Sequence, residues 1–191
     1  MTSDPTAQRI RGRLVYLRAL EADDVALVHR WYQDAGTAAL MGELPRSLAA
    51  MEARYRSGIA DQGRDSYPFL ICRLEDDVSV GRLDLFAIDR ANGSADFGIA
   101  IGDREDRGRG YGRDAVEALS DFAFEELRLE RLHLLTDATN VRAHRTYQAA
   151  GFTVEAVERR AFFQHGRFTD DVHMSLLRHE WEALPRRAVP R

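Results

Sequence analysis

The sequence predicts one mixed α/β domain in which helices pack against a β-sheet. Stretches with a two-residue hydrophobic period alternate with stretches of helical period, in the order β-α-α-β-β-β-α-β-α-β-β. The 191 residues suffice for one domain with a substantial core, and a composition of 45% hydrophobic and 30% charged residues is typical of a globular chain. We expect the domain to span residues 10–180, with flexible ends at 1–9 and 182–191.

The first part of the chain predicts one short strand followed by two helices. Residues 14–19 alternate apolar and polar side chains, as a strand with one buried face does. Acidic residues at 21–24 mark the start of a helix, and Ser47 is a suitable N-cap for a second helix that ends near residue 60. The connection at 34–46 is more apolar than a spacer requires, so we expect a loop that covers a substrate.

The middle of the chain predicts three consecutive strands at 67–74, 78–88 and 95–101. The acidic tripeptide at 75–77 separates the first two, and Asn92-Gly93, a strong turn signal, separates the second from the third. These strands therefore form an antiparallel unit.

The last part of the chain alternates helices and strands before a final hairpin. Gly151 suits the left-handed position that follows a helix end. The expected elements are a helix at 113–127, a strand at 131–137, a helix at 141–150 and two strands at 153–163 and 168–177.

Composition and charge exclude several classes of function. The net charge of −4 does not suggest a nucleic-acid binder, and all 27 basic residues are arginines. No stretch reaches the roughly 18 apolar residues of a membrane span, and no signal segment is present, so we expect no membrane association and a cytoplasmic location. Cys72 lies in an apolar run and is expected to be a buried structural thiol. No histidines and carboxylates have the spacing of a metal site, so no metal is expected.

The segment Arg107-Gly108-Arg109-Gly110-Tyr111-Gly112 has the properties of an anion-binding loop. Glycine accepts the positive φ of tight turns and lets a ligand approach the main chain closely. The first amides of the helix that follows have no carbonyl partner, and they form a site for a diphosphate together with the helix dipole and the charges of Arg107 and Arg109. The segment lacks the Gly-Lys-Ser/Thr of one common phosphate loop and the third glycine of the dinucleotide fingerprint. A mobile surface turn would have the same composition.

Two motifs make the chain similar to a known family. The pattern Arg-x-x-Gly-x-Gly at 107–112, between a strand and a helix, resembles the acyl-CoA pyrophosphate loop of the GNAT superfamily of N-acetyltransferases. Residues 140–152 match that family's second motif, Asn-x-x-Ala-x-x-x-Tyr-x-x-x-Gly-Phe. Residues 14–20 resemble the opening of the branch that acetylates the N-termini of ribosomal proteins, and residues 162–170 resemble the closing hairpin of that branch and of the bacterial spermidine N-acetyltransferases.

This resemblance implies a GNAT fold: a mixed, mostly antiparallel seven-stranded sheet with helices on both faces and with the fourth and fifth strands splayed apart. Acetyl-CoA, the expected co-substrate, would lie in the gap. Its pantetheine would bond to the fourth strand and its pyrophosphate to the loop. The expected cofactor-binding residues are Phe97, Gly98, Ile99, Ala100, Ile101, Arg107, Gly108, Arg109, Gly110, Tyr111, Gly112, Arg113, Asn140, Arg142 and Arg145. Asn140 would also serve as a helix N-cap, and Arg142 and Arg145 are either ligands of the adenosine 3′-phosphate or solvated helix charges.

The resemblance also implies catalytic roles. Tyr147 corresponds to the family's general acid, which would reprotonate the departing thiolate, although a core tyrosine would show the same pattern. A main-chain amide near Gly98 or Ile99 would stabilise the oxyanion. Asp96 is the first candidate for the base, and Asp84 and Glu43 are alternatives.

We therefore expect an N-acetyltransferase that acts on a primary amine of a small molecule or on a protein N-terminus. The connection at 34–46 and the hairpin at 162–170 would contact the acceptor. The alternative is a non-catalytic acyl-CoA-binding protein of the same fold. The resemblance is compatible with a homodimer, but no feature of the sequence fixes the stoichiometry or distinguishes acetyl from longer acyl groups.

Overall fold

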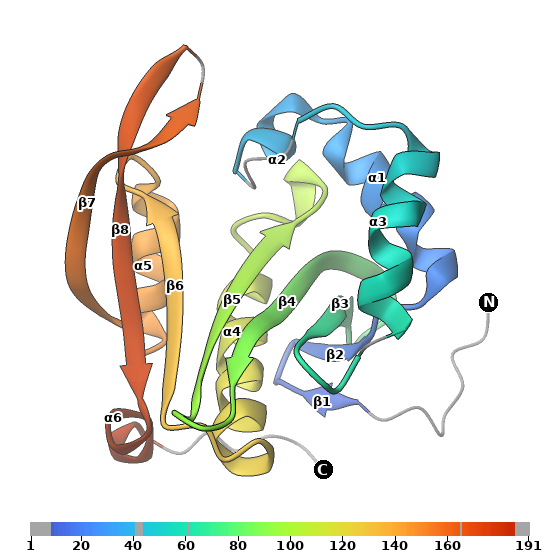
Figure 1. The fold of residues 1–191 in the computed structure, drawn as a ribbon. Helices are drawn as coiled ribbons and strands as arrows, with labels where there is room; N and C mark the ends of the chain where they lie inside the picture. Colours follow the sequence, from blue (N-terminus) through green and yellow to red (C-terminus); the bar gives the residue numbers. More distant parts are fainter. Residues whose placement is uncertain (1–8, 41–43, 61, 165, 186–191) are drawn as a thin grey trace.

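A computed structural model describes residues 9–40, 44–60, 62–164 and 166–185 of the chain (Figure 1). Most of the two ends predicted to be flexible lies outside the described residues. The prediction for 182–191 is wrong at its start, because residues 182 and 183 belong to the last helix, α6 (Arg178–Ala183). No helix in the described part of the chain is long and apolar enough to cross a bilayer.

The strands form a single sheet of eight strands within the described residues, in the order β1-β2-β3-β4-β5-β6-β8-β7. All neighbouring pairs are antiparallel except β5 with β6. The eighth strand is the two-residue β1, which the sequence analysis missed because two residues have no measurable period. The strands are β1 (Ile10–Arg11), β2 (Val15–Ala19), β3 (Tyr67–Arg73), β4 (Ser79–Asp89), β5 (Ser94–Ile101), β6 (Arg131–Asp137), β7 (Thr153–Gln164) and β8 (Arg167–Leu177).

The helices agree with the sequence prediction except in two places. The helix predicted at 113–127 is an α-helix over Tyr111–Asp121 and continues as a π-helix over Phe122–Glu126. The second place is the segment 34–46. This segment was expected to be a loop, but it contains α2, since Asp34 accepts a hydrogen bond from the amide of Thr37 at 2.9 Å and caps the helix start. Ser47 caps α3 as predicted, through a bond of 3.2 Å from the amide of Ala50. Besides α6, the α-helices of the described residues are α1 (Val25–Tyr32), α2 (Ala35–Leu40), α3 (Leu48–Ala60), α4 (Tyr111–Asp121) and α5 (Val141–Ala149).

Helices cover both faces of the sheet, as predicted, because successive side chains of a strand point to opposite faces. On β2, Val15 and Leu17 pack into the core beneath α4 and α5, whereas Tyr16 packs into a second core with α1 and α3. Cys72 lies in this second core with 1% of its surface exposed, as expected of a structural thiol. The sheet therefore separates α4 and α5 on one face from α1 and α3 on the other.

The strands β5 and β6 are splayed apart, as the resemblance implied. They pair in parallel at three positions, the last of which joins Asp96 to His133. Beyond Asp96 the two strands diverge (Figure 1), so residues 97–101 of β5 have no strand partner on that side among the described residues. This divergence leaves one edge of β5 open next to the loop at 107–112.

One buried carboxylate connects the start of the chain to α4. Asp114 is 4% exposed and accepts hydrogen bonds from the amides of Arg13 (3.0 Å), Leu14 (2.8 Å) and Val15 (3.0 Å). A Cβ at position 12 would lie 2.3 Å from its Oδ2 atom, so only glycine fits there. Asp114 thus fixes the turn between β1 and β2 against the first turns of α4.

We expect the substitution Asp114→Asn to lower the free energy of unfolding by about 3 kcal/mol, because an amide group would leave buried backbone donors without an acceptor. Urea unfolding measures the change. The control is Asp23→Asn, since Asp23 is exposed and a surface substitution should stay within about 0.5 kcal/mol. A loss below about 1 kcal/mol for Asp114→Asn would show that the three bonds contribute little.

Candidate active site

The loop before α4 presents a row of free backbone donors. Gly110 is the N-cap and has a φ of +89°, a conformation that favours glycine. The first backbone bond of the helix runs from the amide of Asp114 to the carbonyl of Gly110, at 3.0 Å. Within the described chain, the amides of residues 108–113 donate to no backbone carbonyl. Free amides at the positive end of a helix dipole can bind an anion, so the predicted anion site remains the expected role of this loop.

Arginine side chains surround this loop. Arg109 is exposed and is held by the carbonyl of Glu105, which accepts a 2.8 Å bond from its Nε atom. Arg113 is half exposed. The guanidinium of Arg142 reaches the loop from α5: its Nη2 atom lies 4.0 Å from the position that a Cβ on Gly108 would occupy. The two sequence motifs therefore meet in space. Arg145, also on α5, is exposed.

Arg107 does not add its charge to the loop amides in the expected way. Its Nη2 atom donates to the carbonyl of Gly102 at 2.8 Å and to the hydroxyl of Thr37, and its Nε atom donates to the carbonyl of Ile101 at 3.3 Å. Its backbone amide is also bonded, to the carbonyl of Arg104 at 3.2 Å. The side chain is 15% exposed. These internal acceptors hold the guanidinium at the end of β5, and a contact of Arg107 with the phosphates stays a prediction.

Tyr147 lies on α5 beside the start of the gap between β5 and β6. Its ring contacts those of Phe97 at 6.0 Å and Phe152 at 6.2 Å between centroids. The residue is 7% exposed, and burial raises the pKa of the phenol to about 12. Desolvation is the cause of this shift, and no hydrogen bond joins the hydroxyl to another described residue. Tyr147 is thus part of the core, and its role as a general acid stays a prediction.

Asn140 is the N-cap of α5. Its Oδ1 atom accepts a hydrogen bond from the amide of Ala143 at 3.1 Å, which confirms the capping role. A pantetheine contact through the remainder of this side chain stays a prediction.

The three candidates for the base lie in different surroundings. Asp96 is half-buried at the last paired position between β5 and β6, next to His133 in the register. Asp84 is not a solvent-facing carboxylate, because its side chain is 16% exposed and forms an ion pair with Arg82. Glu43 lies outside the described residues. Asp96 is therefore the described candidate whose carboxylate is not already neutralised by an arginine.

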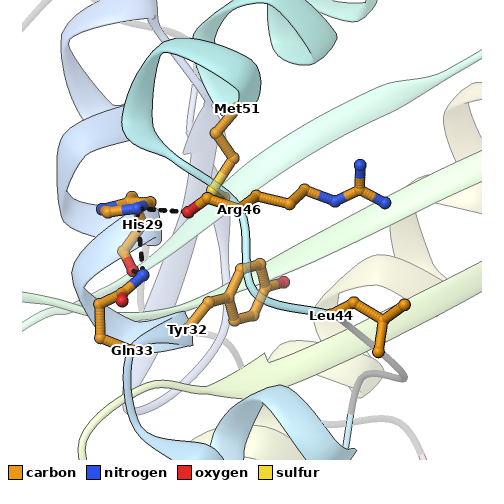
Figure 2. A pocket seen from close by; sticks show the side chains of 6 residues that line it. All are labelled: His29, Tyr32, Gln33, Leu44, Arg46 and Met51. Carbon is orange, nitrogen blue, oxygen red and sulfur yellow. Dashed lines mark hydrogen bonds between the residues drawn. The ribbon is translucent and has the colours of Figure 1, made fainter.

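The face that carries α1 and α3 has a small pocket (Figure 2). The Nε2 atom of His29 lies 3.0 Å from the carbonyl oxygen of Arg46, which ties α1 to the chain before α3. The hydroxyl of Tyr32 accepts a 3.0 Å bond from Arg82, which connects the pocket wall to β4. The residues that line the pocket are His29, Tyr32, Gln33, Leu44, Arg46 and Met51.

The hairpin of β7 and β8 extends beyond the rest of the sheet, across from α2 (Figure 1). Near its tip, Phe163 and Phe168 are 60% and 50% exposed, and their ring centroids are 4.9 Å apart. Arg160 lies over the Phe168 ring at 5.0 Å, and its amide donates to Asp170. Exposed aromatic rings can contact a cationic amine, and the acceptor contact at 162–170 stays a prediction.

Two residues important for this geometry were missed by the sequence analysis. Asp114 lies on the apolar face of α4, and a charged residue at a core position is a signal that a buried carboxylate caps something. Thr37 is 1% exposed in a segment that was expected to be a loop, and no sequence pattern indicated it. No group of three or more His, Cys, Asp or Glu side chains in the described ranges is arranged to hold a metal.

A splayed parallel pair next to a glycine-rich helix start is the arrangement that the resemblance to N-acetyltransferases implied. The chain belongs to the acetyltransferase (GNAT) domain family, which residues 14–153 match. It is an acetyl-CoA-dependent enzyme of that family.

Comparison with known proteins places the chain among two kinds of relatives. The spermidine N(1)-acetyltransferase of Escherichia coli K12 is 28% identical over 170 residues, which cover 88% of this chain and 89% of the relative. A putative ribosomal N-acetyltransferase of Bacillus subtilis is 32% identical over 109 residues, 57% of this chain and 59% of the relative. The crystal structure of the Vibrio cholerae spermidine N-acetyltransferase with CoA and spermine matches with a TM-score of 0.82 at 26% identity, and covers 88% of this chain and 98% of that one.

Proposed function

We propose that this enzyme transfers an acetyl group from acetyl-CoA to a primary amine of a small polyamine, by direct attack of the amine. The observation that carries the proposal is the row of unpaired amides before α4, next to the open edge of β5 and within reach of α5. The relatives that cover most of the chain are named for spermidine, and this favours a polyamine acceptor.

The residues would divide the work as follows. Acetyl-CoA, when bound, supplies a thioester that an amine can attack. The amides of residues 108–113 and the guanidinium groups of Arg109 and Arg142 would hold its phosphates. An amide near Gly98 or Ile99 would donate to the carbonyl oxygen as this oxygen gains negative charge. Tyr147 would give its proton to the sulfur when the carbon–sulfur bond breaks.

Asp96 would remove the proton that the attacking ammonium group must lose, directly or through a water molecule. We expect Asp96→Asn to lower kcat/KM about 100-fold near neutral pH, with CoA affinity unchanged, because general-base catalysis contributes about this much. Steady-state rates measured against pH check the result. Asp84→Asn is the contrasting variant. It removes the ion-pair partner of Arg82, so we expect it to lower the free energy of unfolding. Equal rates for Asp96→Asn and the unaltered chain would remove Asp96 from the mechanism.

A panel of amines tests the proposed acceptor. Thiol release from acetyl-CoA is measured with spermidine, with spermine, and with peptides that have a free N-terminus and a basic sequence. We expect release with the polyamines. Release with peptides alone would indicate N-terminal acetylation, the second candidate, which the Bacillus subtilis relative favours. CoA binding without thiol release from any amine would indicate a non-catalytic acyl-CoA binder. Self-association into a homodimer stays a prediction, which sedimentation equilibrium measures.

A further inference from the structure

The segment just before the anion loop is bonded to α2, although some 70 residues separate them in sequence. Arg107 donates to the hydroxyl of Thr37, and Arg104 forms an ion pair of 2.9 Å with Asp34. Asp34 in turn caps α2 through the amide of Thr37. The start of α2 is therefore held by two arginines that directly precede the free amides.

The hydroxyl of Thr37 is the centre of this contact. It is buried, lies 3.0 Å from Oδ2 of Asp34 and 3.3 Å from the carbonyl of Gly102, and accepts from Nη2 of Arg107. The hydroxyl hydrogen can thus be donated to Asp34 or to the carbonyl of Gly102, while the hydroxyl oxygen accepts a hydrogen bond from Arg107. Gly102 follows β5 directly, so the contact joins α2 to the end of the splayed strand.

The position of α2 indicates what this contact controls. The anion loop and α5 belong to one face of the sheet, whereas α1 and α3 cover the other, and α2 connects these two helices. Figure 1 shows α2 at the open end of β5, across from the hairpin of β7 and β8. With the phosphates of the acyl donor bound at the start of α4, the acceptor amine would approach from the face of the sheet that carries α1 and α3. The helix α2 borders that face.

We propose that Arg107 is a positioning residue that fixes α2 on the acceptor side of the site and does not ligate the phosphates. The bond from Arg107 to Thr37 orders α2, and this order sets the affinity for the acceptor amine. This inference rests on the proposed function insofar as it names the acceptor side. The contact itself can be tested without any acceptor.

The test compares Arg107→Gln, Thr37→Val and the double variant. With spermidine as the probe, we expect each single variant to raise KM about tenfold with kcat and the Kd for CoA nearly unchanged, since both remove the bond between the Thr37 hydroxyl and the charged guanidinium. Arg107→Gln also loses the bonds to the carbonyls of Ile101 and Gly102, and Thr37→Val also loses those to Asp34 and Gly102. The double variant should raise KM by less than the product of the two single effects, because both single variants remove the bond between Arg107 and Thr37. Thr37→Ser keeps the hydroxyl and should restore the original KM. Arg109→Gln is the matched arginine control, and should weaken CoA binding while the KM for spermidine stays unchanged.

Hydrogen exchange makes the outcome independent of the acceptor. Arg107→Gln and Thr37→Val should speed amide exchange in residues 35–40, whereas Arg109→Gln should not. A phosphate-ligating Arg107 would give the opposite pattern: weaker CoA binding for Arg107→Gln, by about 10-fold or more, and no effect of Thr37→Val. Unchanged exchange in α2 would also overturn the proposal. If no amine supports thiol release, the proposed function fails, and the exchange result still decides the role of Arg107.

Discussion

The substitution Gly110→Val is expected to abolish detectable CoA binding. At a φ of +89° a valine is strained, so the loop would have to change its backbone conformation and displace the free amides at the start of α4. Even the Cβ atom would come within 3.3 Å of Leu14. Each bond from an amide to a phosphate oxygen is worth about 1.5–3 kcal/mol, so the loss of two weakens binding about 100-fold or more. Calorimetric titration with CoA measures the effect.

The matched control for backbone strain is Gly166→Val. Gly166 has a φ of +75°, and no atom lies within 4 Å of the position of an added Cβ. This variant carries a similar strain in the hairpin of β7 and β8, far along the chain from the loop, and should bind CoA with unchanged affinity. Unchanged affinity in Gly110→Val as well would show that the loop does not hold the phosphates.

The substitution Tyr147→Phe is expected to lower kcat about 100-fold or more while the Kd for CoA stays the same, because a general acid contributes at least this factor. The phenylalanine keeps the contacts with Phe97 and Phe152 and removes only the hydroxyl. Single-turnover measurement of thiol release gives the rate of the chemical step. Tyr67→Phe is the control, since the Tyr67 hydroxyl makes a single long bond of 3.4 Å to the carbonyl of Gly63, away from the site.

The raised pKa of Tyr147 sets the expected pH dependence. Burial disfavours the phenolate and raises the pKa to about 12, so the acid form is present at every lower pH and is lost as the pH rises through that value. Tyr147 should therefore cause no fall in kcat between about pH 7 and 10. An alkaline fall in that range that disappears in Tyr147→Phe would contradict both the pKa and the assigned role. A rate for Tyr147→Phe equal to that of the unaltered chain would exclude the hydroxyl from catalysis.

Features that depend on local sequence could be predicted. The alternating strands, the turn at Asn92-Gly93 and the caps at Ser47 and Asn140 are decided by neighbouring residues, and the structure contains them within a residue or two of the expected positions. The left-handed Gly110 before α4 was predicted for the same reason. The splay of β5 and β6 is a property of the tertiary structure, and it was reached through the family resemblance and not from the residue pattern.

Features that depend on distant contacts could not be predicted. Arg107 was expected to add its charge to the loop because it begins the motif Arg-x-x-Gly-x-Gly, whereas its partners in the structure, Thr37 and the carbonyl of Gly102, become neighbours only after folding. Asp114 is buried because a turn 100 residues earlier supplies three amides. The helix α2 forms in a glycine-containing segment because Asp34 caps it and the arginines at 104 and 107 hold it. In each case the deciding group lies far away in the sequence.

The central claim is that the free amides of residues 108–113 bind the phosphates of the acyl donor. The most direct measurement is a titration of the 15N-labelled chain with CoA, followed through the backbone amide resonances. We expect the resonances of Gly108, Gly110 and Gly112 to shift in a saturable way, at the same CoA concentrations at which calorimetry reports binding. Saturable binding that leaves these three resonances unmoved would place the phosphates elsewhere and contradict the assigned site.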